Sequence, residues 1–227
     1  MMVNMLDYWP WLALFAPLCL VMLSLLSPPV WLSDSPLKPH WRAINLTSWG
    51  MSWLLSTLVG LAVLHESPMY VFVCILGTGL MTTVLGQTIF TDFIHRKADR
   101  RILRLATVLA FVAGLVFLQL HTNQITLTVY LLWFACATVA IFLPDIGASD
   151  GRAIQLVVAA GFPILGFSGF RWGLIFLIVL LLLWGIGLAV RKRSIKKLFT
   201  EKISQPLVPI IIAPFLLAVL LFNTILY

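Results

Sequence analysis

The chain has 227 residues, of which 61% are hydrophobic and only 10% are charged. A soluble domain has roughly 45–50% apolar residues, so this composition excludes a soluble protein and indicates an integral membrane protein. The net charge of +7 would suggest a nucleic-acid partner in a soluble chain. Here the basic residues lie between apolar stretches, so membrane topology explains them and no nucleic-acid partner is expected.

The apolar runs are long and lack period-two alternation, which favours helices over a membrane barrel. A membrane-spanning helix needs about 20 mostly apolar residues. The sequence therefore predicts an all-α, polytopic helical bundle with about eight transmembrane helices. The predicted spans are 9–26, 47–64, 69–90, 102–120, 124–143, 153–168, 172–190 and 207–226.

The basic residues predict the orientation of these spans, because cytoplasmic loops carry an excess of Lys and Arg. If the break at 91–101 is cytoplasmic, alternation also puts 27–46, 144–152 and 191–206 on that side. Of the 15 Lys and Arg residues, only Arg171 is then external. We expect a protein of the cytoplasmic membrane, in contact with its lipids, with both termini outside.

Four acidic residues lie at predicted cytoplasmic span ends: Asp92, Asp99, Asp145 and Asp150. The basic neighbours of Asp99 favour an ion pair there, and Asp145 follows Pro144, where it can cap or end a span. Asp92 ends the third span after several polar residues, so partial burial is expected. Asp150 has small neighbours, which permit another backbone to approach closely. Asp92 and Asp150 are therefore the candidate catalytic pair, although two unrelated interfacial acids remain an alternative.

A pair of carboxylates suffices for hydrolysis without a metal or a covalent nucleophile. When two carboxyl groups share a water, one keeps a proton while the other acts as a base. The base activates water against a peptide carbonyl, and the acid protonates the developing oxyanion. No cofactor is expected.

Other hydrolytic chemistries lack residues in this sequence. The stretch from Gly166 to Gly169 matches a GxSG pattern, but no histidine from a later span is available to Ser168, which favours a glycine turn at a helix end. The four histidines form no close pair and no HExxH, so no metal site is expected. A phosphate-binding GxxxxGK[ST] loop is also absent from the sequence.

Three short motifs carry a family resemblance. Asp92 is followed by a basic stretch in which Asp99 stands where proline is usual in the pattern D-x-x-x-x-x-I-P-N. The stretch Gly147–Arg152 is similar to G-x-G-D followed by a hydrophobic residue and a lysine, with Ser149 for the second glycine and Arg152 at the lysine position. Pro209–Phe215 is similar to I-P-F-x-P-F. In these motifs the chain resembles the type IV prepilin peptidases, membrane aspartyl proteases that include the preflagellin peptidases.

The resemblance covers roughly residues 69–226. It implies a six-helix peptidase core at 67–227, preceded at 1–66 by two additional spans. It also implies catalysis by Asp92 and Asp150, supported by Gly147, Ser149, Gly151 and Arg152. The implied substrates are prepilin-like proteins with a hydrophobic N-terminal helix, whose leader is cut at the cytoplasmic face. The cysteine-containing domain of bifunctional members is missing from the sequence given, so methyltransferase activity is not expected.

A non-enzymatic function is the alternative. Intramembrane acids also serve proton coupling, so the chain can instead be a degenerate assembly factor or a small proton-coupled transporter. A transporter typically contains paired repeats with broken helices in matching positions. No convincing repeat relates the two halves of this sequence.

Overall fold

The computed structural model describes residues 5–33, 35–95, 98–142, 148–192 and 207–224, and these residues form helices and turns without a strand. The helices in chain order are η1 (Met5–Leu14), α1 (Phe15–Leu26), η2 (Val30–Leu32), η3 (Lys38–His40), α2 (Trp41–Ala62), α3 (Pro68–His95), α4 (Arg100–His121), α5 (Gln124–Ala140), α6 (Ala148–Lys192) and α8 (Leu207–Thr224). The all-α prediction is confirmed.

Four helical stretches are long and apolar enough to cross a membrane: Trp9–Leu26, Pro68–Ile89, Arg100–His121 and Ser149–Leu183. Gln124–Ala140 and Val208–Asn223 are apolar but shorter. α2 has 22 residues, but its buried face carries Asn45 and three serines, which make it less apolar. The chain therefore has the character of a membrane protein, while the count of eight spans stays a prediction.

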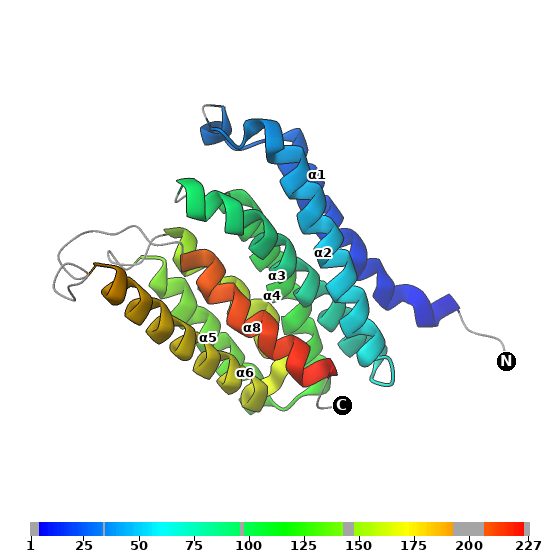
Figure 1. Ribbon diagram of the computed structural model, residues 1–227. Helices are drawn as coiled ribbons and strands as arrows, with labels where there is room; N and C mark the ends of the chain where they lie inside the picture. The colour runs from blue at the N-terminus through cyan, green and yellow to red at the C-terminus, as the bar shows by residue number, and fades with distance from the viewer. Residues whose placement is uncertain (1–4, 34, 96–97, 143–147, 193–206, 225–227) are drawn as a thin grey trace.

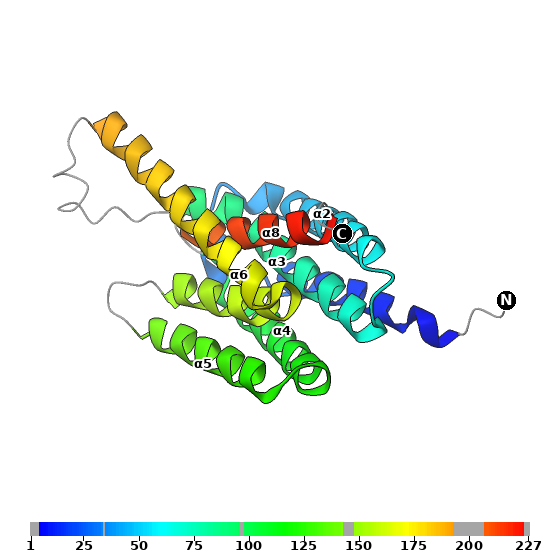
Figure 2. The ribbon, with the colours of Figure 1, turned by 90° about the horizontal axis from the view of Figure 1, so that it is seen from below.

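α3 lies at the centre of the bundle and contacts η1, α1, α2, α4, α6 and α8. Figure 2 shows α2 and α5 toward opposite edges of the bundle. The middle of α3 is buried from Val73 to Val84 without an exposed position. A helix that is buried all round belongs in the interior of a bundle, which explains why α3 has no polar stripe facing outward.

α6 consists of two helical arms that meet at a non-helical residue and turn back on each other, and these arms correspond to two predicted spans (Figure 1). The bend occurs at Gly166, where φ is 60° and ψ is −172°, a region essentially restricted to glycine. The rings of Phe162 and Phe170 lie 5.5 Å apart across the bend. Eight residues of straight helix would separate them by about 12 Å along the axis. The predicted glycine turn is confirmed, although the sequence placed the break at 169–171.

The first arm of α6 packs between α3 and α4, where Gly77 faces Ala160 and Gly114 faces Ala159. The second arm packs against α8, where Phe170 contacts Phe215 with ring centroids 4.9 Å apart. This arrangement returns the chain to the end of the bundle at which α3 ends and α4 begins (Figure 1). Figure 1 also shows the start of α6 at this end of the bundle. The two predicted catalytic positions, at the end of α3 and the start of α6, therefore belong to one end of the molecule.

The second helix begins earlier than the sequence predicts. The predicted span starts at residue 47, whereas α2 starts at Trp41. The side chains of Trp41 and Ile44 are buried in a small apolar cluster with Leu32 and Leu37. This cluster fixes the first turn of α2 against the η2–η3 segment, and hydropathy alone does not show it.

Candidate functional site

The last turns of α3 carry a buried polar face. Gln87, Thr88 and Thr91 are all buried. The two threonine hydroxyls donate to carbonyls of their own helix, Thr88 to Val84 at 2.7 Å and Thr91 to Gln87 at 3.1 Å. Residue 92 follows in the last turn of α3, but the side chain of Asp92 lies outside the described part of the structure.

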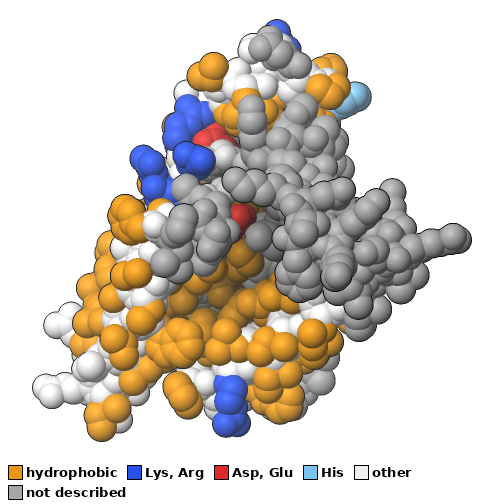
Figure 3. Space-filling model, turned by 90° about the vertical axis from the view of Figure 1, so that its left-hand side faces the viewer, with side chains coloured by type: hydrophobic (Ala, Val, Ile, Leu, Met, Phe, Trp, Pro, Cys, Tyr) orange, Lys and Arg blue, Asp and Glu red, His pale blue; other side chains and the backbone are white. Residues whose placement is uncertain are grey.

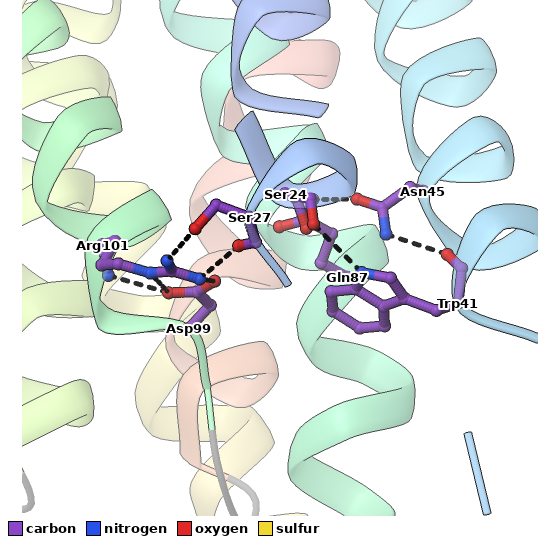
Figure 4. Close-up of polar contacts among 7 residues, drawn as sticks. All are labelled: Ser24, Ser27, Trp41, Asn45, Gln87, Asp99 and Arg101. Carbon is purple, nitrogen blue, oxygen red and sulfur yellow. Dashed lines mark hydrogen bonds and ion pairs between the residues drawn. The ribbon is translucent and has the colours of Figure 1, made fainter. Parts of the chain in front are cut away.

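A chain of hydrogen bonds joins this face of α3 to α2 and α1 (Figure 4). Gln87 Nε2 donates to Asn45 Oδ1 at 2.7 Å, and Asn45 Nδ2 donates to the Trp41 carbonyl at 2.9 Å. Trp41 Nε1 then donates to the Ser24 carbonyl at 3.2 Å. The two N-terminal helices are therefore tied to α3 five residues before position 92.

The start of α4 is held by an ion pair, as the basic neighbours of Asp99 predict. Arg101 lies 3.0 Å from Asp99, and the same carboxylate caps the helix by accepting from the Arg101 backbone N–H at 3.0 Å. Arg101 also donates to Ser27, to its hydroxyl at 2.8 Å and to its carbonyl at 2.6 Å. Figure 4 shows this contact joining the end of α1 to the start of α4.

The start of α6 carries Ser149 and Asp150 in its first turn, both half-buried. Gly151 lies directly against the end of α5, because a Cβ at this position would come within 2.8 Å of Ile141 Cα and 3.0 Å of Ile141 N. The prediction that small residues near Asp150 permit a close backbone approach is confirmed at Gly151. Asp145 and Gly147 lie outside the described residues.

A cavity of about 480 Å³ lies between the end of α1, the start of α4 and the start of α6. Its wall is formed by Pro29, Val30 and Trp31 after α1, by residues 98–101 at the start of α4, and by Ser149. The cavity thus connects the neighbour of Asp150 with the Asp99–Arg101 ion pair and with the segment after the first N-terminal helix. Sequence reasoning did not assign residues 29–31 to a site, because nothing local to them marks it.

Arginines surround the start of α6. Arg152 is half-buried and is repelled by Arg104 and Arg100 of α4. Its Nε atom is buried and has no hydrogen-bond partner. Figure 3 shows Lys and Arg side chains gathered toward one end of the molecule, beside acidic side chains and above a broad hydrophobic band. This end is the one that the sequence predicts to face the cytoplasm.

The alternative of a serine nucleophile at Ser168 has a cavity of its own, which is lined in part by the glycine turn at Gly166. Ser168 and His121 both contribute to a space of about 630 Å³ together with Glu66. His121 Nδ1 is 3.2 Å from the Phe117 carbonyl of its own helix, and its ring stacks on Phe117. No hydrogen bond links Ser168 to His121 among the described contacts, so this cavity lacks the nucleophile–base pair that acyl transfer requires.

The structure brings the predicted residues Ser149, Asp150, Gly151 and Arg152 together in the first two turns of α6. It places position 92 in the last turn of α3, and the separation of the Asp92 and Asp150 carboxyl groups stays a prediction. Among the described residues, no three His, Cys, Asp or Glu side chains are grouped as metal ligands. No family model matches the chain, and no curated protein or solved structure is similar enough to it to indicate a relative.

Proposed function

We propose that the chain is a membrane-embedded aspartyl endopeptidase that removes the leader of prepilin-like substrates at the basic end of the bundle. The main supporting observation is the cavity beside Ser149, because it reaches from the first turn of α6 to residues 98–101 at the start of α4, the helix that comes next in the chain after α3. An acid at the end of α3 and another at the start of α6 form the arrangement that water activation by two carboxylates needs. In this proposal Asp92 and Asp150 are the dyad.

The proposed reaction is peptide hydrolysis. The ionised carboxylate takes a proton from water, and the resulting hydroxide attacks the scissile carbonyl. The protonated carboxyl donates to the oxyanion, and collapse of the tetrahedral intermediate expels the amine, which takes up a proton. Because the carboxylates share one proton, their titrations are coupled and belong to the pair.

The proposed substrate fits the surroundings of the cavity. Val30 and Trp31 offer apolar contact to the end of a hydrophobic helix, and Val30 is 91% exposed. A basic leader is repelled by the arginines around the start of α6, so charge attraction does not dock it. Access is instead lateral, from the membrane, and hydrophobic packing of the substrate helix supplies the binding.

A proton-coupled transporter is the second candidate, and one observation favours it. Buried polar side chains follow the α2–α3 contact, and the hydroxyls of Ser24, Ser56 and Thr78 are buried without a hydrogen-bond partner. Polar groups inside a membrane commonly mark ion or proton paths. Such a path would give proton movement across vesicles, which a peptidase does not need.

The purified chain in vesicles separates these candidates. Incubated with a prepilin-like substrate from the same cell, it is expected to produce the shortened protein, detected by its change in gel mobility. Acidification of the vesicle interior by the same preparation is expected to be no greater than in empty vesicles. Intact substrate together with proton uptake would contradict the peptidase and favour the transporter.

A further inference from the structure

The outward face of α4 combines a basic end with an apolar ridge. Arg104, Val108, Val112 and Val116 follow one another at intervals of four residues, so they form one ridge along the helix. Arg104 is exposed, and the three valines are 57%, 53% and 42% exposed. Arg100 precedes Arg104 by the same interval and is also exposed.

An apolar groove of about 450 Å³ runs beside these valines. One wall is the ridge of α4, and the opposite wall is formed by the N-terminal helices, including Leu12 and Ala16. Phe72 and Leu76 of α3 also line it. All of its described lining is hydrophobic, so the groove suits a hydrocarbon chain.

The length of the ridge matches one leaflet of a bilayer. Residues 104 and 116 are twelve positions apart, which corresponds to about 18 Å along an α-helix. The hydrocarbon core of a bilayer is about 30 Å thick, so one leaflet contributes about 15 Å. An acyl chain in the groove would therefore have its headgroup at the level of Arg104.

The charges at the basic end favour an anion as ligand. Arg152 is repelled by Arg104 and Arg100, and its buried Nε has no partner. Arg101 is already paired with Asp99. The stretches 91–104 and 144–152 together contain six basic and four acidic residues, so even with every acid ionised a positive excess remains. A phosphate is suited to this place, because guanidinium groups bind its oxygens with paired hydrogen bonds.

We propose that this face binds one anionic phospholipid, with its phosphate at Arg100, Arg104 and Arg152 and one acyl chain in the groove beside Val108, Val112 and Val116. This lipid site goes beyond the proposed function: it shares Arg152 with the candidate peptidase site, but retention of a lipid does not require peptidase activity. It is a specific position for a single lipid, as opposed to general contact with the bilayer, because it needs both the arginines and the groove.

Native mass spectrometry of the full chain tests the proposal. The protein, in neutral detergent with equal amounts of phosphatidylglycerol and phosphatidylcholine of the same acyl chains, is expected to retain one phosphatidylglycerol in preference. Each arginine near the membrane surface changes binding by about fivefold. The preference is thus expected to be lost in the variant with three substitutions, Arg100→Gln/Arg104→Gln/Arg152→Gln. Arg171→Gln is the control, because Arg171 is an exposed arginine on the second arm of α6, and it is expected to keep the preference.

Two further pairs of variants, each a test with its control, keep the test decisive if the triple variant does not fold. Arg104→Gln alters one exposed side chain and is expected to reduce the preference about fivefold, whereas Arg104→Lys keeps the charge and most of the binding. Val112→Trp fills the groove and is expected to reduce retention of phosphatidylglycerol, whereas Leu182→Trp, at another exposed apolar position, is not.

Two results would overturn the proposal. The first is an unchanged preference for phosphatidylglycerol in a folded variant without the arginines. The second is displacement of the lipid by glycerol phosphate at the same concentration as by phosphatidylglycerol, because a free phosphate would then be the ligand and the groove would contribute nothing. Weak displacement by glycerol phosphate supports the lipid.

Discussion

Gln87 of α3 donates a 2.7 Å hydrogen bond to Asn45 of α2, and both side chains are buried. The two residues are 42 positions apart in the sequence. Their bond joins the N-terminal helices to the helix that carries Asp92, so it gives those helices a structural role at the candidate site. Between membrane helices, side-chain hydrogen bonds contribute about 0.6 kcal/mol on average and at most about 1.7 kcal/mol.

Replacing one partner of this pair is expected to cost more than replacing both. Asn45→Leu leaves the Gln87 amide buried without its acceptor, which costs about 1–3 kcal/mol, and Gln87→Leu likewise strands Asn45. The Asn45→Leu/Gln87→Leu variant is expected to be less destabilised than the sum of the two single changes. Reversible unfolding in mixed micelles measures this cycle. Strictly additive losses would show that the bond contributes nothing.

At the start of α4, the two roles of Asp99 predict different results for two substitutions. Asparagine is a good helix cap, so Asp99→Asn is expected to keep the helix start while weakening the contact with Arg101. Asp99→Ala removes both the helix cap and the contact with Arg101, and it is expected to lower the free energy of unfolding by about 1 kcal/mol. Thermal unfolding of both variants checks the order. Equal stability of Asp99→Ala and the wild type would contradict the capping role.

Gly151→Ala is expected to displace the first turn of α6. The new Cβ would come within 2.8 Å of the Ile141 backbone, and such overpacking typically costs about 1–3 kcal/mol. Leader cleavage is expected to fall with it, because Asp150 lies in the displaced turn. Gly161→Ala in the same helix is the matched control, since its nearest neighbour would be 3.6 Å away. Equal leader cleavage by both variants and the wild type would show that the contact of Gly151 with Ile141 does not position Asp150.

Gly166 and Gly50 form a second matched pair, because at neither position would a Cβ come within 4 Å of an atom beyond its chain neighbours and the nearby backbone of its own helix. Gly166 has a φ of 60°, so Gly166→Ala is expected to cost about 1–3 kcal/mol through backbone strain. Gly50 lies inside α2, where Gly50→Ala is expected to stabilise by up to about 1 kcal/mol. Thermal unfolding that shows the same sign for both changes would contradict the strain at Gly166.

The sequence predicts those features that depend on neighbouring residues. Apolar runs locate the helices, the glycines near 166 mark the turn, and the basic neighbours of Asp99 indicate its ion pair. Contacts between distant segments were missed. Arg101 binds Ser27 across 74 positions, and nothing near Ser27 marks it as an acceptor.

One missed contact did leave a signal in the sequence. Asn45, Ser48, Ser52 and Ser56 recur at helical intervals, and a polar stripe inside an apolar helix indicates a buried contact with another helix. That pattern identifies the face of α2 but not its partner on α3. The candidate site depends on such partners, so its residues on α6 were predictable while the cavity wall at residues 29–31 was not.

Substitution of the two candidate catalytic acids tests the central claim most directly. Asp92→Asn and Asp150→Asn keep the side-chain size but cannot exchange a proton near neutral pH, so each is expected to abolish leader cleavage in a protein that remains inserted and folded. Because the two groups act as a unit, Asp92→Asn/Asp150→Asn is expected to be no less active than either single variant. Asp99→Asn and Asp145→Asn are expected to retain cleavage of the prepilin-like substrate, followed by its gel mobility. Full cleavage by Asp92→Asn or by Asp150→Asn would contradict the aspartyl-peptidase account.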